Sequence, residues 1–415
     1  MFPLRRSVAR VAVFNPKAYA STLVTRNPLP ATFLRGGTSK GIYLNRADLP
    51  QDRTQWDRIF LGIMGSPDAE YGRQLNGMGG GVSSLSKICV VGAPSDEQRA
   101  QGFDVEYTFV QVGIRDSALD YSGNCGNLSS MIGVFAIDEG LYHPAGAHAG
   151  PTVTVRSFNT NTRKRIDTTF PVAVAEDRNC VPVLDLEQVY MAGVPGKASQ
   201  ITLDFMSPGG ARTGRLLPSG APIDTFSVRG ENKDFVPIDI SLVDATNPTV
   251  FVPEDSIAKL FPSLLLPNLA DADFNADLKH TIEEIRMRGA VRMGLDPTAQ
   301  AQPKICFLSP PAYDDVDAAD IVVRAFSMGV LHKAIPMTVG LCLGVAAGVR
   351  NTLPWQIVTQ ARKARGVDDP VGELVRIRHP GGIVDVGASF DADGQVLSAK
   401  VVRTGRRLMK GVVWW

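Results

Sequence analysis

The amino-acid sequence predicts an α+β protein made of two similar lobes. Short segments with the alternating apolar pattern of β-strands dominate the chain, and a few segments have the 3.6-residue period of helices. This strand-rich pattern runs once to about residue 200 and then starts again. Two such layered units would place a ligand site in the cleft between them.

Length and composition agree with this architecture. The chain has 415 residues, which suggests two or three domains, and its 44% hydrophobic and 20% charged residues are typical of a folded protein. The 43 Lys and Arg against 42 Asp and Glu give a net charge of +1. A charge so close to zero provides no basic field for nucleic acid, so we expect no nucleic-acid partner.

The cysteines and the apolar segments exclude further classes. Five scattered cysteines form no C-x-x-C pair, so the sequence predicts neither a metal site nor a disulfide framework. The longest uncharged apolar segment, residues 335–349, is shorter than the roughly 20 residues that span a bilayer. It is typical of a buried helix, and we expect no membrane span.

The N-terminal segment differs from the rest. Residues 1–47 contain no Asp or Glu but several Arg and Ser, a composition typical of mitochondrial transit peptides. We therefore interpret residues 1–27 as a transit peptide or a disordered basic tail, which favours the mitochondrial matrix or otherwise the cytoplasm. The N-terminal lobe is expected at 28–200 and the C-terminal lobe at 201–400. Residues 401–415 could pack back on the first lobe.

Local patterns predict the elements of each lobe. In the first lobe, strands are expected at 31–34, 41–44, 87–91, 105–113, 153–157 and 168–174, and helices at 52–62 and 127–140. In the second lobe, strands are expected at 200–205, 236–242, 249–252, 304–308, 384–390 and 395–403, and helices at 278–288 and 330–349.

Two glycine-rich loops of the first lobe carry charged and hydroxyl groups. The loop Arg35-Gly-Gly-Thr-Ser-Lys-Gly41 could bring backbone amides, Ser39 and Arg35 against a carboxylate. The loop Gly77-Met-Gly-Gly-Gly81 precedes Lys87, which begins an apolar strand. Such a lysine either lies along the surface or points into a cleft.

The segment Ser122-Gly-Asn-Cys-Gly-Asn127 leads into an apolar helix. Cys125 would lie at the helix N-terminus, where unpaired amides and the positive end of the helix dipole favour a thiolate and a bound carboxylate. Small and polar neighbours, including Asn124, keep the approach open. This environment distinguishes Cys125 from the other four cysteines.

A similar arrangement is expected in the second lobe. Ser327 and Gly329 precede a predicted long helix, which would form a second anion-binding terminus, and His332 would lie one turn inside it. Lys304 begins the preceding strand.

These motifs occur in one order that resembles the PrpF family of 2-methylaconitate cis-trans isomerase, methylitaconate Δ-isomerase, 4-oxalomesaconate tautomerase and fungal aconitate isomerases. Besides the loops above, the resemblance includes Arg292-Met-Gly-Leu295, Pro303-Lys-Ile305 and Ser327-Met-Gly329 with His332, and it covers about residues 30–411. It implies the diaminopimelate-epimerase-like fold, with a curled mixed sheet around a central helix in each lobe and the active site in the cleft.

The resemblance also implies roles for individual residues. Lys87 and Cys125 match the catalytic pair, with base and acid unassigned, and the implied substrate contacts are Arg35, Ser39, Asn124, Lys304, Ser327 and His332. The second lobe carries Ser327 where the epimerases have a partner cysteine. The implied reaction is allylic proton transfer on an unsaturated di- or tricarboxylate, with no cofactor or metal.

Other functions stay open from the sequence alone. The chain could act on a related acid, or it could be a non-catalytic accessory protein of an aconitase-type iron–sulfur dehydratase. A homodimer and a functional link to such a dehydratase are possible. A cysteine hydrolase that uses Cys125 with His332, and a carboxylate sensor, are the remaining alternatives.

Overall fold

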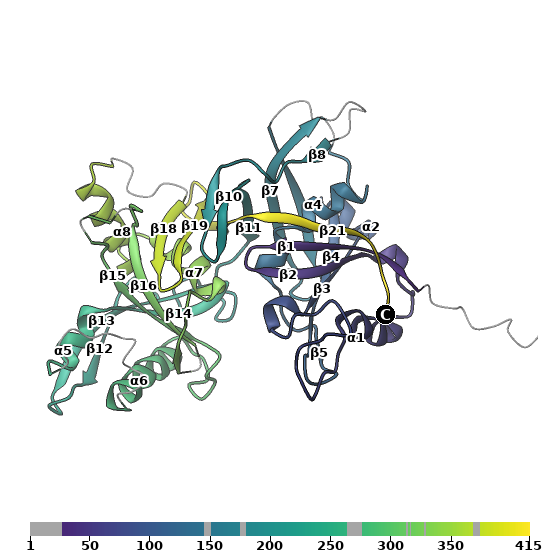
Figure 1. Cartoon of the computed structure of the whole chain (residues 1–415). Helices are drawn as coiled ribbons and strands as arrows, with labels where there is room; N and C mark the ends of the chain where they lie inside the picture. The colour runs from purple at the N-terminus through teal and green to yellow at the C-terminus, as the bar shows by residue number, and fades with distance from the viewer. Residues whose placement is uncertain are drawn as a thin grey trace, which may run out of the picture.

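The computed structural model describes residues 27–415 except 145–150, 175–179, 264–275, 313, 316, 328 and 368–373. The chain forms two strand-rich lobes that lie side by side (Figure 1). Residues 1–27, interpreted above as a transit peptide or tail, lie outside the described residues except for Asn27. The α+β class predicted from the sequence is confirmed.

A curved mixed sheet forms the lobe on the right of Figure 1. Its strand order is β21–β1–β2–β3–β4–β6–β7, in which the pairs β2–β3 and β4–β6 are parallel and the others antiparallel. The strands are β1 (Leu29–Gly36), β2 (Ser39–Asn45), β3 (Lys87–Gly92), β4 (Val105–Val112), β6 (Thr152–Asn159), β7 (Lys164–Val174) and β21 (Gly405–Val413); β5 (Leu119–Asp120) and β8 (Cys180–Pro182) extend β4 and β7.

The second lobe repeats this design. Its strand order is β20–β19–β18–β16–β15–β14–β13–β12, in which β16–β18 and β14–β15 are parallel. The strands are β12 (Asp224–Arg229), β13 (Phe235–Ala245), β14 (Asn247–Pro253), β15 (Lys304–Ser309), β16 (Ile321–Ser327), β18 (Leu374–His379), β19 (Gly382–Phe390) and β20 (Val396–Arg403); β17 (Val330–Leu331) pairs with the end of β16.

Two features of the strands connect the lobes. Strand β11 (Ile201–Met206) pairs with β7 on one side and with β20 on the other, so the two sheets are continuous. The chain then leaves β20, turns at Thr404 and returns as β21 beside β1. Figure 1 shows this last strand in yellow, crossing to the right-hand lobe. The C-terminal residues 405–413 are therefore part of the N-terminal lobe's sheet.

Each sheet wraps a buried helix. In the first lobe α3 (Gly126–Ser129) and α4 (Ile132–Asp138) follow each other, and residues 132–136 are all buried. In the second lobe α7 (Met337–Gly348) is buried at every residue from Val339 to Ala347. A helix that is apolar on all sides has to lie inside the fold.

The remaining helices are α1 (Trp56–Met64), α2 (Asp96–Ala100), α5 (Asp255–Leu260), α6 (Ala276–Arg292) and α8 (Leu353–Ala364). The buried residues of α1, α5 and α6 pack on the outer faces of the sheets, whereas α8 packs against α7 and belongs to the same apolar cluster. In the described part of the chain, no helix has the length and apolar character needed to cross a membrane.

The sequence analysis missed α8, β16 and β18, and β21 as a separate strand.

Both central helices differ from the prediction: one begins later than predicted, and the other is divided in two. The helix predicted at 330–349 begins only at Met337, so the prediction that Ser327 and His332 lie at its start is wrong. Pro336 explains the difference, because proline has no N–H to donate and clashes with the preceding turn inside a helix. The helix predicted at 127–140 is divided into α3 and α4.

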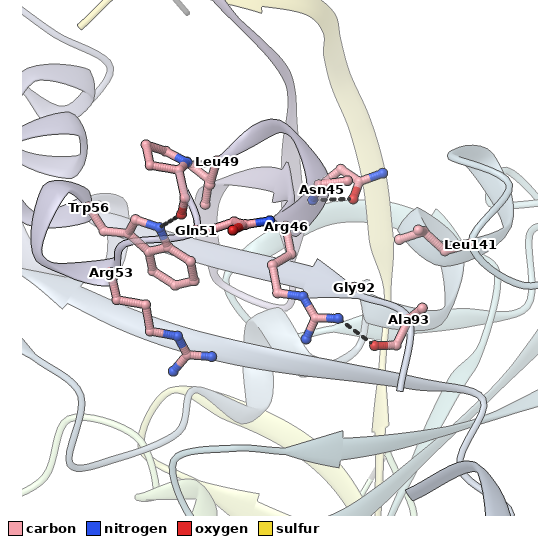
Figure 2. A pocket seen from close by; sticks show the side chains of 11 residues that line it. Asn45, Arg46, Leu49, Gln51, Arg53, Trp56, Gly92, Ala93 and Leu141 are labelled. Carbon is pink, nitrogen blue, oxygen red and sulfur yellow. Dashed lines mark hydrogen bonds between the residues drawn. The ribbon is translucent and has the colours of Figure 1, made fainter. Parts of the chain in front are cut away.

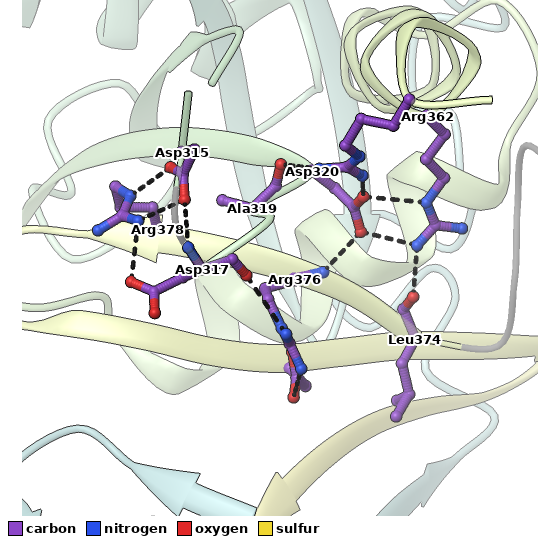
Figure 3. A network of polar contacts seen from close by, with 10 residues as sticks. Asp315, Asp317, Ala319, Asp320, Arg362, Leu374, Arg376 and Arg378 are labelled. Atoms are coloured by element: carbon purple, nitrogen blue, oxygen red, sulfur yellow. Dashed lines mark hydrogen bonds and ion pairs between the residues drawn. The ribbon is translucent and has the colours of Figure 1, made fainter. Parts of the chain in front are cut away.

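A buried charge network ties α8 to the second sheet (Figure 3). The Asp320 carboxylate accepts hydrogen bonds from Arg362 Nε at 3.1 Å, Arg362 Nη2 at 2.7 Å and the Arg376 amide at 2.9 Å, and it also pairs with Arg365. Burial would raise the pKa of Asp320, but the hydrogen bonds and the positive charge of Arg362 outweigh it and lower that pKa. The carboxylate therefore stays charged inside the fold.

We predict that Asp320→Asn lowers the free energy of unfolding by about 3–5 kcal/mol, because it leaves Arg362 as a buried cation without a counter-charge. Urea unfolding at pH 7 measures the loss. Since the folded pKa of Asp320 is lowered, this stabilisation is present above the unfolded pKa and is lost as the pH falls through the folded one. The exposed Asp393→Asn serves as the control. A loss below about 1 kcal/mol, the range of surface pairs, would contradict the prediction.

Candidate active site

The two buried helices meet end to end where the lobes join. Gly126 begins α3 and Met337 begins α7, and a Cβ added to Gly126 would lie 2.2 Å from Met337 Sδ. Neither first turn receives a side-chain cap. Helix N-termini without caps present unpaired amides and a positive partial charge, so the junction is suited to an anion.

Cys125 is the residue directly before α3, as the sequence predicted. Its side chain is half-buried, and its Sγ lies 3.9 Å from Ser39 Oγ. Ser39 begins β2 and is buried. The sheet thus holds a hydroxyl against the thiol at the helix terminus.

The turn between β1 and β2, two residues after Arg35, packs directly on α3. A Cβ at Gly37 would lie 2.3 Å from Asn127 Oδ1, and Gly37 has a φ of +55°, so this position requires glycine. Arg35 Nη1 donates to the carbonyls of Gly37 at 2.9 Å and Thr404 at 3.1 Å. These bonds tie the loop to the turn between β20 and β21. Burial and the nearby Arg406 lower the pKa of Arg35.

Lys87 begins β3 with its side chain buried over the ring of Phe109, 5.1 Å from the centroid. Its amine donates to Gln111 Oε1 on the neighbouring strand. Side chains of a strand alternate, so Lys87 and Cys89 share the face that is turned to α3. Burial and Cys125 raise the pKa of Cys89, whereas Tyr43 and Lys87 act in the opposite direction. Cys125 and Lys87 therefore both influence the pKa of the buried Cys89 thiol.

Hydrogen bonds from other side chains of the protein hold the side chain of Asn124 in place. Its Oδ1 accepts hydrogen bonds from Tyr107 at 3.1 Å, Ser129 at 3.2 Å and Asn159 at 3.3 Å. These contacts fix the loop before Cys125. Asn124 also lines the cavity at the lobe junction described below.

His332 lies just after β17, and its Nδ1 accepts the Ala334 amide at 3.1 Å. His379, at the end of β18, accepts the Gly381 amide at 3.1 Å in the same way. A ring nitrogen that accepts from an amide carries no proton, so the neutral rings carry theirs on Nε2. Burial, Arg403 and His332 lower the pKa of His379 to about 4, so it is neutral at pH 7.

Two further predicted contacts, Lys304 and Ser327, belong to strands of the second lobe. Lys304 lies in β15 opposite Thr249, and burial and Arg286 lower its pKa. The structure records no contact that joins Lys304 to Cys125 within the described residues. Ser327 ends β16, and its side chain is outside the described residues.

The sequence analysis missed two residues at the junction, Arg403 and Asn127. Arg403 ends β20, is only 9% exposed, and its Nε donates to Asn127 Oδ1 at 3.0 Å. Asn127 Nδ2 in turn donates to Thr38 at 3.1 Å and Ser39 at 3.4 Å. Burial lowers the pKa of Arg403 to about 10, with Cys125 acting in the opposite direction, so Arg403 remains a cation at pH 7.

A cavity of about 480 Å³ opens beside the two helix ends. It is lined from both lobes by Asn124, Gly126, Met337 and Thr338, together with the cations Lys164, Arg165 and Arg212. None of its lining residues is an Asp or Glu. Arg165 is already paired with Asp167, so the preference of the cavity for an anionic ligand depends on Lys164 and Arg212.

The comparisons with known proteins give the family and the fold of the chain. The model of the PrpF protein family matches residues 26–415. The chain belongs to the PrpF family. It is 36% identical to 3-methylitaconate isomerase of Eubacterium barkeri, over 93% of this chain and 97% of that protein. It is 34% identical to 2-methyl-aconitate isomerase of Shewanella oneidensis, over 92% of this chain and 96% of that protein.

A solved structure gives the same result for this PrpF-family chain. The crystal structure of methylitaconate-delta-isomerase matches with a TM-score of 0.77 and 33% identity, over 94% of this chain and 96% of that one. The diaminopimelate-epimerase-like fold predicted from the resemblance is confirmed, and the chain is an isomerase. In the described part, no group of His, Cys, Asp or Glu is arranged to hold a metal ion.

A second cavity of this PrpF-family member, of about 670 Å³, lies near the ends of β2 and β3 (Figure 2). It is lined by Arg46, Arg53 and Trp56 among others. Trp56 donates from Nε1 to the Pro50 carbonyl at 2.8 Å, and Arg46 is paired with Glu106. None of the predicted site residues lines it, so its size does not make it the active site.

We predict that iodoacetamide at pH 7 alkylates Cys125 before the other cysteines. Cys125 is partly exposed and lies directly before α3, so its sulfur is accessible to the reagent. Burial raises the pKa of Cys342 to about 12 and also raises those of Cys89, Cys180 and Cys306. Peptide mapping by mass spectrometry gives the order of labelling.

The variant Cys125→Ser is the control, and it should lose the first labelled peptide and keep the others. First labelling at any other cysteine, including the partly buried Cys180, would contradict this account of the site.

Proposed function

We propose that the chain catalyses allylic proton transfer on an unsaturated tricarboxylate such as aconitate or 2-methylaconitate, without a cofactor. The observation that carries the proposal is the position of Cys125 at the junction of two helix N-termini without side-chain caps. Lys87 begins the strand whose inner face is turned to the same helix. The relatives named above are isomerases of methylitaconate and methylaconitate.

The proposed reaction begins with removal of a proton from the carbon next to the carbon–carbon double bond. The electron pair of the broken C–H bond spreads through the double bond into a carboxylate, which becomes dienolate-like. Return of the proton to the same carbon after rotation gives the cis-trans isomer, and return to the far carbon shifts the double bond. Lys87 and Cys125 would supply the base and the acid.

Charge that develops on the carboxylate has to be stabilised in place. Amides of the first turns of α3 and α7 and the cation Arg403 lie at the junction before the reaction starts. Groups held in this way need no reorganisation in the transition state, which is where such stabilisation accelerates a reaction.

The second candidate function is the shift of a carbon–carbon double bond, which is the reaction of a Δ-isomerase. The chain is 33% identical to (4E)-oxalomesaconate Delta-isomerase of Novosphingobium sp., over 93% of this chain and 97% of that protein. The substrates of these enzymes differ by small groups, and one methyl group changes the binding free energy by about 1–3 kcal/mol. We therefore propose the same proton-transfer mechanism for either substrate.

We predict that the isolated protein converts cis-aconitate, or an analogue with a 2-methyl or oxo group, in D₂O without added metal. Proton NMR should show the isomer with deuterium at the allylic carbon. Cys125→Ser and Lys87→Met should each lower turnover by roughly 100-fold or more, because a positioned acid or base contributes about that factor. Cys180→Ser, which changes a cysteine of β8, is the matched control and should keep turnover.

Two results would contradict the proposal. Turnover that survives in both Cys125→Ser and Lys87→Met would remove these residues from the reaction. Absence of turnover and of deuterium exchange with every acid would favour the accessory role beside an aconitase-type dehydratase.

We also propose the mitochondrial matrix as the location. The support is the composition of residues 1–27, which contain four Arg and no acidic residue. The family match begins at residue 26, so almost all of this segment is additional to it. A fusion of residues 1–27 to a fluorescent protein should enter mitochondria, and a cytoplasmic signal would contradict the proposal.

A further inference from the structure

Arg403 is a buried cation without an anionic partner. Its recorded hydrogen bonds go from Nε to Asn127 Oδ1 at 3.0 Å and from Nη1 to the Val402 carbonyl at 2.8 Å. Among the residues that the structure describes, no carboxylate forms an ion pair with it, and no bond from Nη2 is recorded. Burying a charge in this way costs free energy unless an opposite charge compensates it.

Comparison with the other buried arginines makes this exception clear. Arg362 is paired with Asp320, and Arg286 is paired with Glu283. The chain thus provides carboxylates where a buried arginine supports the fold. At Arg403 both near acceptors are neutral amide oxygens.

The position of Arg403 indicates which anion could supply its counter-charge. It ends β20 at the point where the chain crosses back to the first lobe, and its Nε donates to Asn127 in the first turn of α3. Asn127 holds the guanidinium through its oxygen and binds Thr38 and Ser39 through its nitrogen. The guanidinium is therefore fixed beside the start of α3, the helix that follows Cys125.

We propose that Arg403 binds one carboxylate of the substrate at the lobe junction, and that Asn127 is the positioning residue that orients the guanidinium. This inference rests on the proposed function for its substrate class, the di- and tricarboxylates. A guanidinium donates through several N–H groups in a plane, so Nη2 can take a carboxylate oxygen while Nε keeps Asn127. The ligand then supplies the counter-charge that the fold lacks.

The test is calorimetric titration of the full chain with tricarballylate, a saturated tricarboxylate that cannot undergo allylic isomerisation. Arg403→Met should weaken binding by roughly 10- to 100-fold, which corresponds to a lost charge-assisted hydrogen bond. Arg406→Met removes a charge from an exposed side chain three residues away and should leave the affinity within about 2-fold.

Thermal unfolding separates this role from a structural one. If Arg403 serves the ligand, Arg403→Met should keep or raise the unfolding temperature without ligand, because a buried charge without a counter-charge is removed. A lower unfolding temperature with unchanged affinity would overturn the proposal. If Arg403→Met does not fold, the affinity of Arg403→Lys for tricarballylate tests the proposal instead. Lysine keeps the positive charge but cannot bind Asn127 and a carboxylate at the same time. Wild-type affinity in Arg403→Lys would overturn the proposal, and a loss of about 10-fold would support it.

The titration also distinguishes failure of this inference from failure of the proposed function. Binding that depends on Arg403, in a protein that isomerises none of the acids, would contradict only the proposed reaction. Isomerisation together with unchanged binding in Arg403→Met would contradict only the role of Arg403.

Discussion

The arrangement of the site depends on one constraint, which is that the two central helices are buried on all sides. Helix α7 is buried from Val339 to Ala347, and α4 is buried over residues 132–136. Helices enclosed by sheets can expose unpaired backbone groups only at their ends. Because Gly126 and Met337 are in contact, the two sets of N-terminal amides meet at one point between the lobes. The anion-binding character of the junction follows from the packing.

The strands then bring side chains to that point from both ends of the sequence. The start of β2 contributes Ser39, the start of β3 contributes Lys87, and the end of β20 contributes Arg403. The return of the chain as β21 fixes this assembly, since Thr404 accepts hydrogen bonds from Gly37 N at 2.9 Å and from Arg35. A site assembled from a junction can bind a ligand that carries several carboxylates, because different elements can each hold one.

Local sequence signals predicted the start of the central helix in the first lobe and failed for the start of α7 in the second lobe. Cys125 stands in a run of small residues before an apolar helix, which is a pattern within a few positions, and the helix starts there. Arg403 stands in an ordinary strand, and its burial arises only because the chain turns back at Thr404. No local pattern contains that information. The late start of α7 was available from Pro336, because a proline is disfavoured inside a helix.

The central claim is that the substrate lies at the junction of α3 and α7. A crystal structure of Cys125→Ser with trans-aconitate tests it directly. The account predicts a carboxylate within hydrogen-bond distance of the amides that begin α3 and of Arg403, with the allylic carbon near Lys87. A ligand in the cavity beside Trp56, or one at the junction that contacts neither the α3 amides nor Arg403, would contradict it.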